Sequence, residues 1–126
     1  MFKKFTNFLN KNSSDSSSAD EVQEISVQEL KEIMDRSPDA YVLDVRETEE
    51  WEIAHIEGAV FKSFNTFEQN YQDVPKDRPI YIHCKVGGRS MAAAKFLKTK
   101  GYGQVFNVRG GIDAWAREID KNMRRY

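Results

Sequence analysis

The stretch that decides the fold runs from Ile80 to Gly101 and reads IYIHCKVGGRSMAAAKFLKTKG. Its first four residues, 80–83, form a short apolar run that is typical of a strand buried on both faces. A loop with two glycines follows, and the Ala-rich segment 90–100 predicts a helix that ends at Gly101, because glycine suits the position just after a helix. The stretch is therefore a strand–loop–helix unit, with the sole cysteine, Cys84, where the strand ends.

The segments before this unit repeat the alternation of helix and strand. Ser26 and Glu29 have the spacing of a capping box, which predicts a helix from Val27 to about Arg36. The other elements that we expect here are a buried strand over 41–45, a helix over 48–55 with Thr48 as its N-cap, a short strand over 59–61, and a short helix around Phe64, Phe67 and Tyr71.

The segments after the unit complete the pattern. A strand is expected over 105–108, then a turn at Gly110-Gly111, then a helix whose apolar stripe comprises Ile112, Trp115, Ile119 and Met123. Strands separated by helices imply parallel pairing with right-handed crossovers, so we predict an α/β fold with three layers, a mostly parallel central sheet flanked by helices. In such sheets ligands bind beyond the carboxyl ends of the strands, and Cys84 lies at one of these ends.

The composition bounds the class of protein. The 126 residues include 19 basic and 20 acidic side chains, and the net charge of -1 gives no overall field that would attract nucleic acid. One cysteine can form neither an internal disulfide nor a multi-cysteine metal site. The sequence has no apolar run of the ~18 residues that span a bilayer, and no apolar core of a secretory signal. A reducing cytoplasm is the expected location.

Residues 1–21 differ in composition from the rest. Residues 13–18 read SSDSSS, which predicts a flexible linker, and residues 22–126 are expected to form the folded domain. Before the linker, Phe2, Phe5, Phe8 and Leu9 recur at helical spacing beside lysines, so this end is either a frayed tail or a short amphipathic helix that contacts a partner or a membrane surface.

The loop after Cys84 has the features that prepare a nucleophilic thiol. None of the residues 85–90 is proline, so each has an N–H to donate, and Gly87 and Gly88 can let the loop curl toward one point. A helix N-terminus and the cationic side chains of Lys85 and Arg89 add positive charge. These features stabilise a thiolate over a thiol, whereas a lone cysteine without them is more often a small buried apolar residue.

These residues resemble those of a known family. The sequence CKVGGRS over 84–90 is similar to the active-site loop C-x-x-G-x-R-S of single-domain rhodaneses, the thiosulfate sulfurtransferases. The resemblance extends over about 24–118: it includes LDVR at 43–46, EW at 50–51 and HIEGA at 55–59, then GY at 101–102, Val105, Asn107, GGI at 110–112 and AW at 114–115.

The resemblance implies a function and a site. Cys84 would be the nucleophile that accepts a sulfane sulfur and passes it to a thiophilic acceptor such as cyanide or a thiol. Lys85 and Arg89 would orient a small anionic donor such as thiosulfate, and the chemistry would need no metal or organic cofactor. The residues whose N–H groups would surround the outer sulfur are Lys85, Val86, Gly87, Gly88, Arg89 and Ser90.

Other interpretations stay open at this stage. The domain could instead relay persulfide to or from a protein partner, or regulate one. A phosphatase or arsenate reductase on the same fold is disfavoured, because only four residues separate Cys84 from Arg89 where those relatives have five. Asp44 and Arg46 are expected to form a structural ion pair or to support the loop from behind, and His55 is expected to be structural. With no second cysteine, a persulfide on Cys84 must pass its sulfur to an external acceptor.

Overall fold

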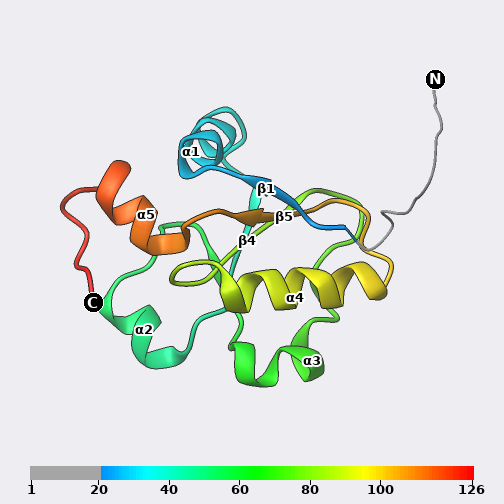
Figure 1. The fold of residues 1–126 in the computed structure, drawn as a ribbon. Coiled ribbons are helices and arrows are strands. Elements are labelled where there is room, and N and C mark those ends of the chain that lie inside the picture. The colour runs from blue at the N-terminus through cyan, green and yellow to red at the C-terminus, as the bar shows by residue number, and fades with distance from the viewer. Residues whose placement is uncertain (1–20) are drawn as a thin grey trace.

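A computed structural model describes residues 21–126, which form one five-stranded sheet. Helices cover both faces of this sheet (Figure 1). The strands lie in the order β1-β5-β4-β2-β3, and every neighbouring pair is parallel. The predicted α/β fold with a parallel central sheet is therefore confirmed. The strands are β1 (Gln23–Ile25), β2 (Tyr41–Asp44), β3 (Val60–Phe61), β4 (Ile80–His83) and β5 (Val105–Val108). The predicted tail, apart from Glu21, lies outside the described residues.

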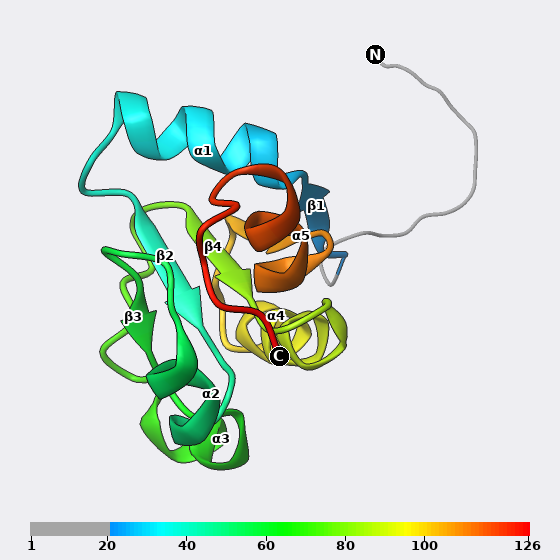
Figure 2. The same ribbon diagram turned by 90° about the vertical axis from the view of Figure 1, so that its left-hand side faces the viewer.

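The helices divide into two layers, which the turned view of Figure 2 separates. They are α1 (Val27–Arg36), α2 (Thr48–Ile53), α3 (Phe67–Asn70) after a 3-10 turn at Phe64–Thr66, α4 (Gly88–Thr99) and α5 (Gly111–Glu118). Because successive strand residues point to opposite faces, the core has two parts. Leu43 packs with Leu97 of α4, whereas its neighbour Val42 packs with Leu30 of α1 and Trp115 of α5.

The first helix forms as its capping box predicts. The Glu29 N–H donates to the Ser26 side chain at 3.0 Å, and the Ser26 N–H donates to the Glu29 carboxylate at 2.8 Å. Helix α1 covers Val27–Arg36, the predicted range. Among residues 21–126, no helix has the length and apolar character that crossing a membrane requires.

The expected cap of the second helix was wrong. Its N-cap is Glu47, not Thr48, and the Glu47 N–H donates to the Glu50 carboxylate at 3.0 Å. The Glu47 carboxylate also accepts from the N–H of Asn65 at 3.1 Å and from Ser63, so this residue links the start of α2 to the 3-10 turn. The helix ends at Ile53, two residues before the predicted His55.

Other boundaries also differ from the prediction. Strand β1 was not predicted, since three residues are too short to produce a pattern, yet it pairs with β5 at the sheet edge. Helix α4 begins at Gly88 rather than Ser90, because Gly87, with φ of 128°, turns the chain into the helix early. Helix α5 ends at Glu118, although Met123, the last residue of the predicted stripe, still packs against the core. The remaining strand and helix ends lie within a residue of the prediction.

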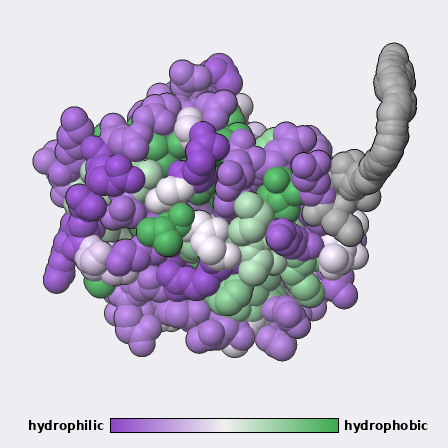
Figure 3. Space-filling model, viewed as in Figure 1, coloured by the Kyte–Doolittle hydropathy of each residue, from purple (hydrophilic) through white to green (hydrophobic). Residues whose placement is uncertain are grey.

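The surface is mostly hydrophilic in the view of Figure 3, with an apolar area over α4 and smaller apolar patches elsewhere. A groove of about 400 Å³ runs along this area, between α4 and α3. It is lined by Phe64, Phe67, Ala92, Ala93 and Phe96, together with polar residues of the 3-10 turn and α3.

Candidate active site

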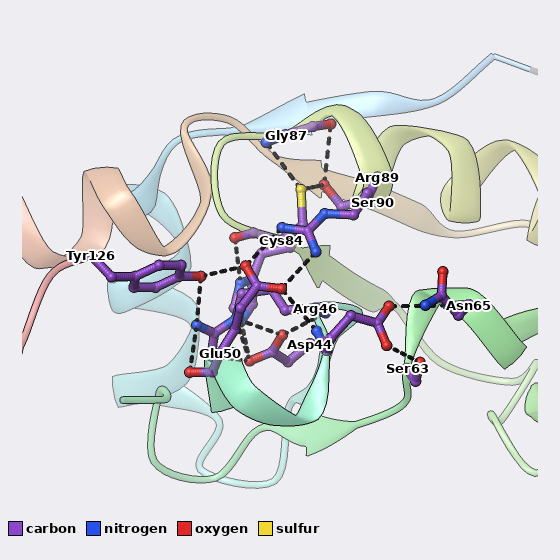
Figure 4. A network of polar contacts seen from close by, with 12 residues as sticks. Asp44, Arg46, Glu50, Ser63, Asn65, Cys84, Gly87, Arg89, Ser90 and Tyr126 are labelled. Carbon is purple, nitrogen blue, oxygen red and sulfur yellow. Dashed lines mark hydrogen bonds and ion pairs between the residues drawn. The ribbon is translucent and has the colours of Figure 1, made fainter. Parts of the chain in front are cut away.

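Cys84 follows β4, a central strand of the sheet, and lies beneath a loop that leads into α4. Its side chain is almost fully buried, with 1% of the residue exposed. The sulfur accepts a hydrogen bond from the Gly87 N–H at 3.1 Å, and the Ser90 hydroxyl lies 3.4 Å from it (Figure 4). The structure thus places the predicted nucleophile at the centre of the loop that the sequence predicted.

The loop lowers the pKa of the Cys84 thiol. Burial acts in the opposite direction and alone would raise this pKa, but the Ser90 hydroxyl and the N–H groups of Ser90, Gly87 and Val86 outweigh it. Their partial positive charges stabilise the negative sulfur, so the balance favours the thiolate. The thiolate is the form that attacks another sulfur atom.

Ser90 connects the loop to the strand beside it. Its hydroxyl lies 2.6 Å from Oδ1 of Asn107 on β5 and 3.2 Å from the Gly87 carbonyl. Asn107 in turn donates from Nδ2 to the Glu24 carboxylate at 3.0 Å. A hydroxyl has one proton, so Ser90 can donate to only one of Asn107, the Gly87 carbonyl and the thiolate at any moment. The sequence showed Asn107 only as part of the resemblance, because its contact with Ser90 spans 17 residues.

The start of α5 holds the other side of the loop. The Ile112 N–H donates to the Cys84 carbonyl at 2.9 Å, and the Asp113 N–H donates to the Lys85 carbonyl at 3.0 Å. This approach requires a glycine at position 111, since a Cβ there would lie 2.5 Å from both carbonyl oxygens. The predicted Gly110-Gly111 turn therefore supports the cysteine loop directly.

Arg89 is at the loop, but its guanidinium is already paired. It makes a bidentate ion pair with Glu50 of α2, with distances of 2.7 and 2.9 Å from Nη1 and Nη2 to the two carboxylate oxygens. The hydrogen bonds from Arg89, with smaller contributions from Tyr126 and the Glu47 N–H, lower the pKa of Glu50 to about 2. Glu50 is therefore charged near neutral pH, and sequence reasoning did not predict it as part of the site.

Tyr126, which the sequence analysis did not identify, joins the same network. Its hydroxyl donates to Oε2 of Glu50 at 2.8 Å and accepts from Nη1 of Arg46 at 3.0 Å. The Lys85 ammonium lies 4.5 Å from the centre of the Tyr126 ring, a cation–π distance. Both cationic residues that the sequence assigned to donor binding thus have neighbours within the protein.

Asp44 and Arg46 form a buried ion pair at the end of β2. Both side chains are fully buried, and Arg46 Nη2 lies 2.7 Å from Asp44 Oδ2. Arg46 also donates to the carbonyls of Glu50 at 3.2 Å and Ala54 at 2.8 Å, so it ties α2 to the sheet. The hydrogen bonds of this pair reach α2 and Tyr126, and the sulfur of Cys84 accepts none of them.

The two histidines lie in different surroundings. His83 is buried, its Nδ1 lies 3.1 Å from the Cys84 carbonyl, and Nε2 lies 3.7 Å from Asp44. Burial lowers the pKa of His83, which favours its neutral form. His55 stacks on Trp51 with ring centroids 3.7 Å apart.

Comparison with known proteins places this geometry among sulfur-handling domains. A family model described as the Rhodanese-like domain matches residues 26–118. A protein named sulfurtransferase from Allochromatium vinosum is 35% identical over 96 residues, which cover 76% of this chain and 90% of that protein. The "Putative sulfur carrier protein YrkF" of Bacillus subtilis is 37% identical over 114 residues, 90% of this chain and 62% of the relative.

Longer proteins also contain such a domain. The chain spans 26% of the length of curated relatives named as combined adenylyltransferases and sulfurtransferases. The crystal structure of reduced Bacillus anthracis CoADR-RHD matches with a TM-score of 0.73 and 30% identity, over 82% of this chain and 18% of that one. Together these relatives support sulfur transfer through a cysteine as the general activity of the domain.

Proposed function

We propose, from the premise that the chain belongs to the rhodanese-like domain family, that Cys84 carries sulfane sulfur as a persulfide between a donor and a thiophilic acceptor. The observation that carries this proposal is the lowered pKa of a buried thiol that accepts hydrogen bonds from the surrounding loop. A persulfide ends in one large, anionic sulfur atom, and N–H groups that converge on one point can stabilise it.

With thiosulfate as donor, the proposed step conserves atoms and charge. The Cys84 thiolate attacks the outer sulfur, the S–S bond of thiosulfate breaks, and sulfite leaves with the bonding electron pair. The product is a Cys84 persulfide anion. Attack by cyanide on its outer sulfur then releases thiocyanate and restores the thiolate. Thiosulfate is the anionic donor that the family resemblance implies for the cations Lys85 and Arg89.

A second candidate is relay of sulfur from another persulfide, and two observations favour it. Arg89 is engaged by Glu50, so the guanidinium that would bind a small anion is occupied. Val86, on the same loop, is 64% exposed, which leaves an apolar contact for a larger donor beside the sulfur. The relatives named as a sulfur carrier and as adenylyltransferase-linked sulfurtransferases suit this second candidate.

We further propose that residues 22–126 are sufficient for the activity. The family match over 26–118 and the contacts around Cys84 support this assignment. A chain that starts at Val22 should load sulfur at the rate of the full chain and melt at the same temperature. A sharp fall in either quantity would contradict the assignment.

The proposed function can be tested by measuring the mass of the intact protein. The reduced chain is incubated with thiosulfate or with mercaptoethanol persulfide, and intact mass spectrometry then follows the addition of one sulfur atom. We expect addition with at least one donor, loss of the added sulfur as thiocyanate on treatment with cyanide, and no addition to Cys84→Ser. Failure of both donors, or turnover of phenyl phosphate without sulfur loading, would overturn the proposal.

A further inference from the structure

Tyr126 points its hydroxyl toward Glu50, beside the cysteine loop (Figure 4). Its ring faces Lys85, and its hydroxyl contacts Glu50, the partner of Arg89. Both oxygens of the Glu50 carboxylate are used: Oε1 accepts from Arg89 and from the Glu47 N–H, and Oε2 accepts from Arg89 and from Tyr126. We call Tyr126, Glu50 and Arg89 the latch.

A buried arginine fixes the orientation of the Tyr126 hydroxyl. Arg46 is fully buried and held by Asp44, and it donates to the hydroxyl oxygen at 3.0 Å. Arginine has no acceptor, so the single proton of the hydroxyl is left for Glu50. A second contact holds the same segment, because Arg125 lies 3.0 Å from Asp113 on α5. Tyr126 therefore stabilises the arrangement in which Glu50 is paired with Arg89.

The latch affects donors according to their chemistry. Thiosulfate carries a sulfonate group that would need Arg89, so Glu50 must be displaced before the guanidinium can bind it. Glu50 is charged near neutral pH and does not leave by protonation. A persulfide donor presents a single sulfur to Cys84 and needs only the N–H groups of the loop. The closed latch therefore opposes the first donor more than the second.

We infer that Tyr126 is a positioning residue that keeps Arg89 paired with Glu50 and thereby makes the site select persulfide donors over small dianionic sulfonates. The inference rests on the proposed function and specifies the chemical class of its sulfur donor. In the selected step, the Cys84 thiolate attacks the outer sulfur of the donor persulfide, the donor S–S bond breaks, and the donor thiolate leaves with the electron pair. No oxidant or reductant is consumed, because the sulfane sulfur only changes its partner.

The test uses Tyr126→Phe, which removes the hydroxyl and keeps the ring beside Lys85. The hydroxyl stabilises only the state in which Glu50 is paired with Arg89. Each tenfold change in an equilibrium constant corresponds to ~1.4 kcal/mol. A hydrogen bond to a charged group contributes at least this much. We therefore expect KM for thiosulfate to fall about tenfold with kcat little changed, and both constants for mercaptoethanol persulfide to stay as in the wild type. Tyr81→Phe, which removes a hydroxyl on the face of the sheet packed by α1 and α5, is the matched control.

Two further measurements separate the latch from a merely structural role. Sulfate should protect Cys84 from iodoacetamide at a lower concentration in Tyr126→Phe than in the wild type, which is a readout independent of turnover. Glu50→Gln removes the competing charge and should shift thiosulfate KM in the same direction. If the wild type loads sulfur but both variants leave thiosulfate KM unchanged or raise it, the latch is wrong. If the wild type loads from neither donor, the proposed function itself fails.

Discussion

Replacing Gly111 by alanine should damage the fold and the cysteine loop together. Gly111 has φ of 57°, in the left-handed region, and a Cβ would lie 2.5 Å from the carbonyl oxygens of Cys84 and Lys85. The backbone conformation costs an alanine ~1–2 kcal/mol. Overpacking a rigid site costs ~1–3 kcal/mol more. These carbonyls accept the N–H groups that begin α5, so relief of the collision requires the loop or the helix to move.

The total of ~2–5 kcal/mol is a large part of the ~5–15 kcal/mol that stabilises a typical domain. At ~4 °C or more for each kcal/mol, the melting temperature should fall by about 8 °C or more. Gly103→Ala is the matched control, since a Cβ at that position has nothing within 4 Å and the backbone has no positive φ. This control should change stability by less than ~0.5 kcal/mol.

Two assays follow the effect of Gly111→Ala. Circular dichroism gives the melting temperature, and the rate of Cys84 alkylation by iodoacetamide, measured against pH in the cold, reports whether the loop still stabilises the thiolate. We expect a lower melting temperature and an alkylation midpoint shifted to higher pH. If Gly111→Ala has the same melting temperature as Gly103→Ala, and its Cys84 has the same alkylation midpoint as in the wild type, the reasoning about the α5 contact is refuted.

Three other predictions concern the cysteine loop and the buried Asp44–Arg46 pair. In the wild type, the alkylation rate of Cys84 should rise with pH through the lowered pKa of its thiol, so its midpoint should lie below ~8.5, the value of an ordinary thiol; a midpoint at or above that value would contradict the hydrogen-bond account. Ser90→Ala should raise this midpoint by up to ~1–2 pH units, because a hydrogen bond to a charged group contributes ~1.5–3 kcal/mol; no shift would mean that Ser90 donates its proton to Asn107 or to the Gly87 carbonyl and not to the thiolate. Arg46→Met should destabilise the fold by ~3–5 kcal/mol in urea unfolding, since it leaves Asp44 buried without its partner, and a loss below ~1 kcal/mol would show that the pair is dispensable.

The sequence predicted those parts of the fold that depend on local chemistry. Ser26 and Glu29 are three residues apart, so their reciprocal bonds can be recognised from spacing alone, and α1 has the predicted ends. The Thr48 cap was wrong because the carboxylate of Glu47 is drawn to Ser63 and Asn65, a contact across 16 and 18 residues that no local pattern reveals. Strand β1 is stable only through its pairing with β5, more than 80 residues away.

The same distinction applies to the site. The loop from Cys84 to Ser90 is continuous in sequence, so its chemistry could be predicted from residue types and their order. The neighbours of its two cationic side chains could not be predicted in this way, because Glu50 lies 39 residues from Arg89 and Tyr126 lies 76 residues from Glu50 in the sequence. Only the packing of α2 and the segment after α5 against the sheet brings these groups together. Sequence reasoning therefore located the cysteine loop but missed the residues that contact the two cations beside it.

The most direct test of the central claim follows the sulfur atom itself. The chain is loaded with a donor whose sulfane sulfur is radiolabelled, freed of excess donor, divided, and either digested or treated with cyanide. The account predicts that the label is found on the peptide containing Cys84 and that cyanide moves it into thiocyanate in an amount equal to the label lost. Label on any other peptide, or label on Cys84 that cyanide cannot remove, would contradict it.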